Sequence, residues 1–147
     1  MYKVIKKDNN QERKINRFKE SVIKVEMENN ILALSKKLLV DVQTAHKRFQ
    51  LSKEEGVRGD FHSEVKPFAD DVKLAADEWR ESAGQWVRNN RPRNLHANQI
   101  ETAADYLEVI SVQAFFPETS KKRFLDQIQS VEFILNSMII AIEKTRQ

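Results

Sequence analysis

Two short stretches of the sequence gather side chains that could bind a ligand or take part in catalysis. The stretch "RNNRPRNLHANQIE", residues 88–101, contains Arg91, Arg93 and His96, and residues 121–123 are "KKR". Arginine and lysine bind phosphates and carboxylates, and histidine can add acid–base or metal chemistry. These two clusters are therefore the first candidates for a functional site.

The sequence lacks the residue patterns of common catalytic and metal sites. It contains no cysteine, and its histidines, His46, His62 and His96, lie far apart. Metal-binding four-helix bundles typically carry Glu-x-x-His pairs, and none occurs here. Glycine-rich phosphate loops, Gly-x-Ser-x-Gly elbows and His-Glu-x-x-His zinc helices are also missing. The sequence predicts a protein that is not an enzyme and has no metal or cofactor.

The net charge of +3 is carried by the first part of the chain. Of 25 Lys/Arg and 22 Asp/Glu, residues 1–26 hold 8 and 4, which leaves 17 and 18 for residues 27–147. The body is slightly acidic, so the net charge gives little support for nucleic-acid binding by residues 27–147. Residues 1–26 are predicted to be a basic N-terminal extension.

Composition also bears on the compartment. No uninterrupted apolar run approaches the roughly 20 residues of a membrane span, and no signal-like apolar segment follows the lysine-rich start. The lack of cysteine suits a reducing environment. We expect a cytoplasmic protein without a membrane span.

The pattern of apolar residues predicts the fold. The chain has only three glycines and three prolines, and four segments place apolar residues three or four positions apart, as the buried stripe of a helix requires. The stripes are Ile31, Leu34, Leu38, Val42, Ala45, Phe49; Val65, Phe68, Val72, Ala75, Trp79, Ala83, Trp86; Ile100, Ala103, Leu107, Ile110, Ala114; and Phe124, Ile128, Val131, Leu135, Met138, Ile142. Short connections at 52–60, 90–95 and 116–120 favour antiparallel neighbours, so residues 27–147 are predicted to form an all-α, up-and-down four-helix bundle.

Pro67 leaves two possibilities for the start of the second helix. If it occupies the first helical turn, residues 61–65 form a separate short turn with Asp60 or Ser63 as its cap. The alternative is one kinked helix that begins at Asp60.

The end of the second helix is predicted near residue 90. Asn89 and Asn90 tolerate the left-handed conformation that terminates helices. Arg91 precedes a proline, which biases it toward an extended conformation.

The third helix is predicted to begin after His96. Gln99 would then complete a capping box, and Leu95 and Ile100 would form a hydrophobic staple. This spacing favours a structural corner over a functional site.

The cluster Lys121, Lys122 and Arg123 opens the fourth helix, where the helix dipole disfavours cations. Glu118 and Asp126 are close enough in sequence to offset these charges. The rival interpretation is that the cluster binds an anion or an acidic partner. In an up-and-down bundle it lies at the opposite end from residues 88–96, so the two clusters do not form one track for duplex DNA.

Several short motifs resemble the YppE-like family, small helical proteins of Gram-positive bacteria with no assigned function. They are "VKPF" at 65–68, "AADEW" at 75–79, "RPRNLHANQIE" at 91–101 and "KKRF" at 121–124, in the same order as in the family. The resemblance runs from about Met27 to the C-terminus and implies a four-helix bundle. It supplies no catalytic residues.

Residues 1–26 lie outside that resemblance. Ile15, Phe18, Val22 and Val25 keep a helical spacing, but a helix continued this far would extend beyond its partners. We predict a mobile or marginally helical arm in the monomer. Translation that starts at Met27 is the alternative.

Together these observations predict a small non-enzymatic protein-interaction module, a monomer or weak homodimer with an unidentified protein partner. The candidate partner contacts are Arg91, Arg93, His96, Lys121, Lys122 and Arg123. Two alternatives stay open: weak nucleic-acid binding through residues 1–26, and a small-molecule site or unrecognised active site near Trp79 and Trp86.

Overall fold

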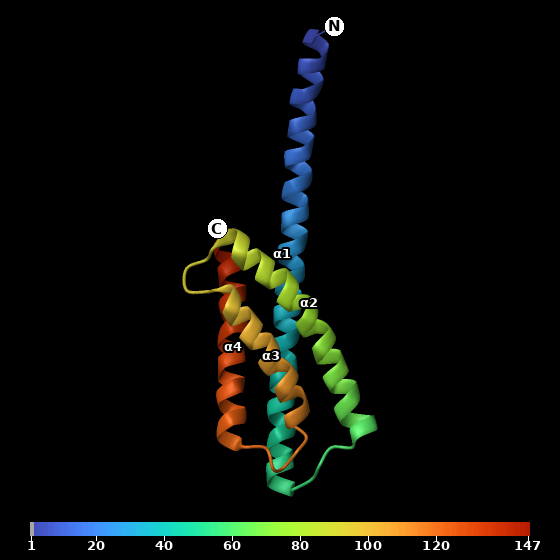
Figure 1. Cartoon of the computed structure of the whole chain (residues 1–147), viewed down its shortest axis with the longest axis vertical. Coiled ribbons are helices and arrows are strands. Elements are labelled where there is room, and N and C mark those ends of the chain that lie inside the picture. Colours follow the sequence, from blue (N-terminus) through green and yellow to red (C-terminus); the bar gives the residue numbers. More distant parts are fainter. Residues whose placement is uncertain (1) are drawn as a thin grey trace. The chain divides into compact units, whose positions relative to one another are not determined.

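The computed structural model describes residues 2–147, with side chains from Asn9 onward, so the first residue of the predicted extension lies outside it. The elements are α1 (Tyr2–Glu55), a π-helical turn η1 (Phe61–Val65), α2 (Lys66–Asn90), α3 (Ala97–Gln113) and α4 (Lys121–Lys144) (Figure 1). The chain divides into two compact units, residues 1–30 and 31–147. The helix α1 contributes to both.

The second unit is the predicted bundle. Residues 31–55 of α1 pack with α2, α3 and α4, and successive helices run in opposite directions (Figure 1). The α2–α3 and α3–α4 connections lie at opposite ends of the bundle, as expected (Figure 1). The all-α, antiparallel four-helix fold is confirmed.

The four predicted stripes form the core of this unit. Every stripe residue is buried except Leu34 and Phe68, which are partly buried and pack against the core. Phe49 of α1 and Phe124 of α4 stack with their ring centroids 4.1 Å apart. The helical periodicity of apolar residues therefore accounts for the packing of the whole bundle.

Trp79 is the largest fully buried side chain, and its polar atom is satisfied. Its Nε1 donates a hydrogen bond to Ser35 Oγ at 2.9 Å, and Ser35 Oγ donates to the Ile31 carbonyl at 2.8 Å. Buried tryptophan usually requires such a partner. The pair ties α2 to α1 inside the core.

The start of α2 combines features of both predicted arrangements. Residues 61–65 form the separate turn, and the Asp60 carboxylate caps it by accepting hydrogen bonds from Ser63 N at 2.9 Å and Ser63 Oγ at 2.8 Å. These bonds lower the pKa of Asp60. The turn leads directly into α2, whose first turn contains Pro67, as the first of the two arrangements requires.

The helix α1 ends at Glu55, three residues beyond Ser52, where the sequence predicts the first connection to begin. The buried Ser52 stays helical, and its hydroxyl donates to the Ala114 carbonyl at 2.9 Å. Gly56, at φ 64°, lies just beyond the last residue of α1, and the Gly59 N–H then bonds to the Phe115 carbonyl at 2.9 Å. These contacts fasten the α1–α2 connection to the end of α3.

Among the described residues, α4 alone is long and apolar enough to cross a membrane by length and composition, which differs from the expectation of no such segment. Its buried residues, such as Phe124, Leu135 and Ile142, belong to the bundle core. Core helices of soluble proteins have the same composition, so this is weak evidence for a membrane span.

Residues 9–30 form a helical stretch of α1 that carries apolar side chains. A single helix cannot bury its own apolar face, because burial requires a second element to pack against. Phe18 is 70% exposed, and Ile15, Val22 and Val25 are also exposed. We expect rapid amide hydrogen exchange across residues 18–25 in a dilute monomer, as in a mobile arm. Slow exchange there, comparable to that of residues 31–49, would contradict the prediction.

Candidate functional site

The α2–α3 corner differs in one respect from the sequence prediction. Arg91, expected to be extended, adopts the left-handed conformation (φ 46°, ψ 57°) and caps α2, with its N–H bonded to the Val87 carbonyl at 2.9 Å. Asn90 remains helical, and its side-chain amide donates to the Trp86 carbonyl at 2.9 Å. The need to cap α2 outweighs the preference of a residue before proline.

The start of α3 follows the predicted capping arrangement. The His96 N–H donates to Gln99 Oε1 at 2.7 Å, and Leu95 and Ile100 are both buried. His96 itself is exposed, in an extended backbone conformation. The structural interpretation of this corner therefore accounts for the positions of these residues.

We predict that Gln99→Ala lowers the free energy of unfolding by about 1 kcal/mol, since the His96 N–H loses its partner at the helix start. Asn98→Ala is a neighbouring control on an exposed side chain and is expected to change stability by less than about 0.5 kcal/mol. Urea denaturation measures both. Equal effects of the two variants would show that the cap contributes nothing.

The cluster at the start of α4 is not neutralised as predicted. Glu118 pairs instead with Arg58, with 2.7 Å between carboxylate and guanidinium. Within the part of the chain that the structure describes, Lys121, Lys122 and Arg123 form no salt bridge, including none with Asp126. The Glu118 side chain extends toward the α1–α2 connection, where Arg58 offers a partner.

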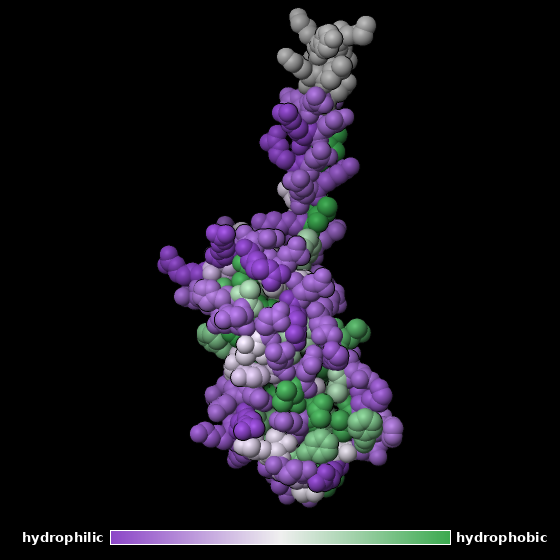
Figure 2. Space-filling model, viewed as in Figure 1, coloured by the Kyte–Doolittle hydropathy of each residue, from purple (hydrophilic) through white to green (hydrophobic). Residues whose placement is uncertain are grey.

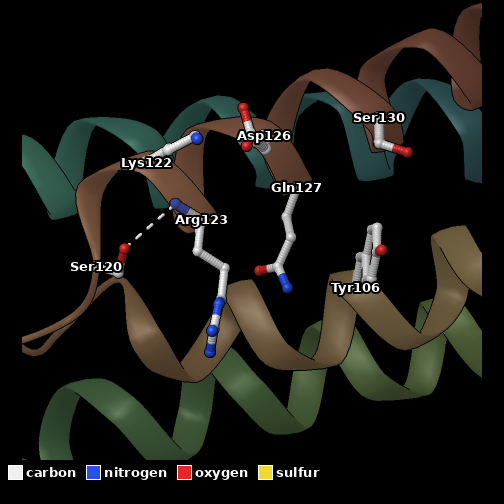
Figure 3. Close-up of a pocket in the computed structure, with 7 residues that line it drawn as sticks. All are labelled: Tyr106, Ser120, Lys122, Arg123, Asp126, Gln127 and Ser130. Carbon is white, nitrogen blue, oxygen red and sulfur yellow. Dashed lines mark hydrogen bonds between the residues drawn. The ribbon is translucent and has the colours of Figure 1, made fainter.

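A polar hollow of about 520 Å³ lies beside this cluster, between α3 and α4. Figure 3 shows Arg123 and Gln127 extending from α4 toward α3, and Tyr106 extending back from α3. Gln127 Oε1 is buried without a hydrogen-bond partner among the described residues. The lining residues are Tyr106, Ser120, Lys122, Arg123, Asp126, Gln127 and Ser130.

An apolar hollow of about 460 Å³ lies at the other end of α4, against the α2–α3 corner. Phe133 and Ile140 of α4 are 64% and 55% exposed there. The cations Arg93 and Lys144 stand at the same hollow and are also exposed. The lining residues are Trp86, Asn90, Pro92, Arg93, Asn94, Phe133, Ser137, Ile140, Ala141, Lys144 and Thr145.

A third hollow of about 230 Å³ connects these two. It shares Ser130 with the polar hollow and Phe133 with the apolar hollow, and Gln99 and Thr102 line its α3 side. The three hollows follow one another along the same side of α4, and we call them together the α3–α4 groove. From Lys122 to Lys144 it follows α4 for roughly 33 Å, at about 1.5 Å per residue.

The groove brings together only some of the predicted contact residues. Arg93, Lys122 and Arg123 line it, whereas Arg91, His96 and Lys121 do not. Of the two tryptophans, Trp79 is fully buried, and Trp86 lines the apolar hollow while only 5% exposed.

The most exposed apolar residues of the groove were not predicted. Phe133 and Ile140 lie seven positions apart on α4, off the buried stripe that contains Leu135 and Met138. Two apolar residues seven apart on the polar side of an amphipathic helix were the signal in the sequence.

The carboxylates of α3 are engaged in a salt-bridge network with α2. Arg80 contacts Glu101 at 3.1 Å, Asp105 at 2.9 Å and Glu108 at 3.8 Å. Partial burial disfavours the charged form of Arg80 and so lowers its pKa. The hydrogen bond to Asp105 and the charges of the three neighbouring carboxylates have the larger, opposite effect, so the pKa of Arg80 is raised. In the described part of the chain, no three His, Asp or Glu side chains converge as metal ligands. These carboxylates serve to join two helices.

Comparison with known proteins defines the class. Residues 35–142 match the model of a bacterial domain of unknown function, DUF1798, and the chain belongs to this family. The uncharacterised protein YppE of Bacillus subtilis is 25% identical over 112 residues, which cover 76% of this chain and 91% of YppE.

Solved structures of related proteins share the fold. A protein of unknown function from Listeria innocua is 28% identical, with a TM-score of 0.77 over 82% of this chain and 96% of that one. The crystal structure of YppE, 24% identical, gives a TM-score of 0.76 over 80% of this chain and 96% of that one. A DUF1798 protein from Staphylococcus aureus is 20% identical, with a TM-score of 0.71 over 78% of this chain and 96% of that one. These relatives come from Gram-positive bacteria, and none has an assigned function.

Proposed function

We propose that this protein is a small, cytoplasmic, non-enzymatic interaction module that binds a partner protein in the α3–α4 groove. The observation that supports this is the exposure of Phe133 and Ile140 over a hollow that already contains Trp86 and Pro92. Apolar side chains grouped on the surface of a small protein typically mark a binding surface. Much of the surface visible in Figure 2 is hydrophilic. Apolar side chains also gather near the bundle end where α3 finishes and α2 begins, and others are exposed on residues 15–25.

A small-molecule ligand is the second candidate, because the apolar hollow is large enough for one. The continuation of this hollow past Phe133 and Ser130 favours a longer occupant. A compact ligand would fill one end of the groove, whereas a protein segment can follow α4.

The proposal can be tested by affinity capture from the native bacterium with three baits: wild type, Phe133→Ala and Leu74→Ala. Leu74 is 74% exposed on α2 and lines none of the three hollows of the groove, so it is a matched apolar control. We expect at least one captured protein to be lost with Phe133→Ala and kept with Leu74→Ala. Identical capture by all three baits would refute the groove as the binding surface.

Nucleic-acid binding through residues 1–26 predicts a different outcome. Binding to DNA or RNA would weaken steeply with salt and disappear when these residues are removed, while Phe133→Ala would have no effect. The same variants therefore separate the two functions.

A further inference from the structure

We infer that the partner of the α3–α4 groove is an amphipathic helix with acidic residues near both ends and apolar residues in its middle. This inference rests on the proposed function and specifies the chemistry of the partner. It follows from the order of side chains along the groove: Lys122 and Arg123 at one end, Phe133 and Ile140 farther along, and Arg93 with Lys144 at the other end.

The charges at the two ends are available for a partner. Among the described residues, none of Lys122, Arg123, Arg93 and Lys144 takes part in a salt bridge. Among the described residues that line the three hollows, Asp126 alone is acidic, and it lies next to two cations. Glu118 lines an adjoining hollow that shares Ser120 and Arg123, and it is paired with Arg58. Carboxylates of a partner would therefore meet excess positive charge at each end, which favours complementary charge at the rim of an interface.

A helix fits this groove better than an extended segment does. Extended peptides usually bind by adding a strand to the edge of a sheet, and this all-helical bundle provides no such edge. A groove between two helices binds an amphipathic helix through apolar anchors on one face. A length of roughly 33 Å matches a helix of about 22 residues.

A second copy of this chain does not fit by charge. The 22 residues 9–30, which carry its exposed apolar side chains, contain five Lys/Arg and four Asp/Glu, so they have a net positive charge. Such a segment would bring a net positive charge to a groove that is itself cationic, and a groove facing its own copy would do the same. Like charges brought together at an interface are unfavourable, so the occupant is a different, acidic protein segment.

The test is a selection from a display library of random peptides about 20 residues long, against the full-length chain. We expect enriched peptides with acidic residues near both ends and an apolar stripe between them. Phe133→Ala should weaken their binding by about tenfold or more, as loss of a central aromatic contact does, and Leu74→Ala by less than about twofold.

Charge-reversal variants test the two ends separately. Arg93→Glu and Lys122→Glu should each weaken binding severalfold, while Lys47→Glu, on an exposed part of α1 away from the groove, should not. The loss should be greater at low salt, where surface charges are less screened.

The possible failures are distinguishable. Enriched peptides that depend on Phe133 but are neutral or basic would overturn the acidic partner and leave the groove as the binding surface. Peptides that ignore Phe133→Ala, or a selection that enriches nothing, would overturn the groove and the proposed function with it.

Discussion

Replacement of Trp79 by alanine is expected to lower the free energy of unfolding by about 3 to 5 kcal/mol, as truncation of a large buried aromatic typically does. The indole is fully buried at the contact of α2 with α1. Its loss leaves a cavity and also leaves the Ser35 hydroxyl without the donor at 2.9 Å. Urea denaturation followed by circular dichroism measures the change.

Two further variants separate the causes. Trp79→Phe keeps an aromatic ring and removes the N–H donor, so it should cost less than Trp79→Ala. Leu74→Ala truncates an exposed side chain of the same helix and should change stability by less than about 0.5 kcal/mol. A loss below about 1 kcal/mol for Trp79→Ala would mean that Trp79 is not a core residue.

The second large effect is expected at Gly59, where Gly59→Ala should destabilise the protein by about 1 to 3 kcal/mol. A Cβ atom at this position would lie 2.6 Å from Cδ1 and 2.8 Å from Cβ of Phe115. The backbone cannot move away freely, because the Gly59 N–H bonds to the Phe115 carbonyl at 2.9 Å. Phe115 is buried, so its ring has little room to adjust.

Gly84→Ala is the matched control and should act in the opposite direction. Gly84 lies within α2, and a Cβ there would meet only the flexible end of Arg88, at 3.4 Å or more. Alanine in a helix interior is favoured over glycine by about 0.5 to 1 kcal/mol. Thermal or urea unfolding of both variants checks the pair, and stabilisation by Gly59→Ala would contradict the close packing at that turn.

Apolar periodicity was sufficient to predict the bundle because each helix has one face to bury. The stripe from Phe124 to Ile142 is buried throughout, and the stripe from Ile100 to Ala114 likewise. Local chemistry was sufficient for the start of α3, where Gln99 bonds to the N–H of His96, whereas for the turn before α2 it left Asp60 and Ser63 as alternative caps, of which Asp60 is the one observed. In these places local preference and tertiary packing favour the same conformation.

Other features depend on contacts that sequence spacing does not contain. The left-handed Arg91 follows from how α2 ends, and Glu118 binds Arg58 across a connection instead of a neighbour along the chain. The groove exists because the surfaces of α3 and α4 leave a hollow beside Phe133. The sequence shows that Phe133 and Ile140 lie off the buried stripe of α4, but it does not show which residues of α3 and of the α2–α3 corner lie opposite them.

Photo-crosslinking in cells tests the groove most directly. A photo-reactive phenylalanine derivative is placed at Ile140 in the groove, or at Leu74 on α2 as the control, in the protein expressed in its own bacterium. We predict that irradiation of the Ile140 variant gives a discrete adduct heavier than the 17.2 kDa chain and containing a different protein, and that the Leu74 variant does not. No adduct at position 140, or the same adducts from both positions, would contradict a partner-binding groove between α3 and α4.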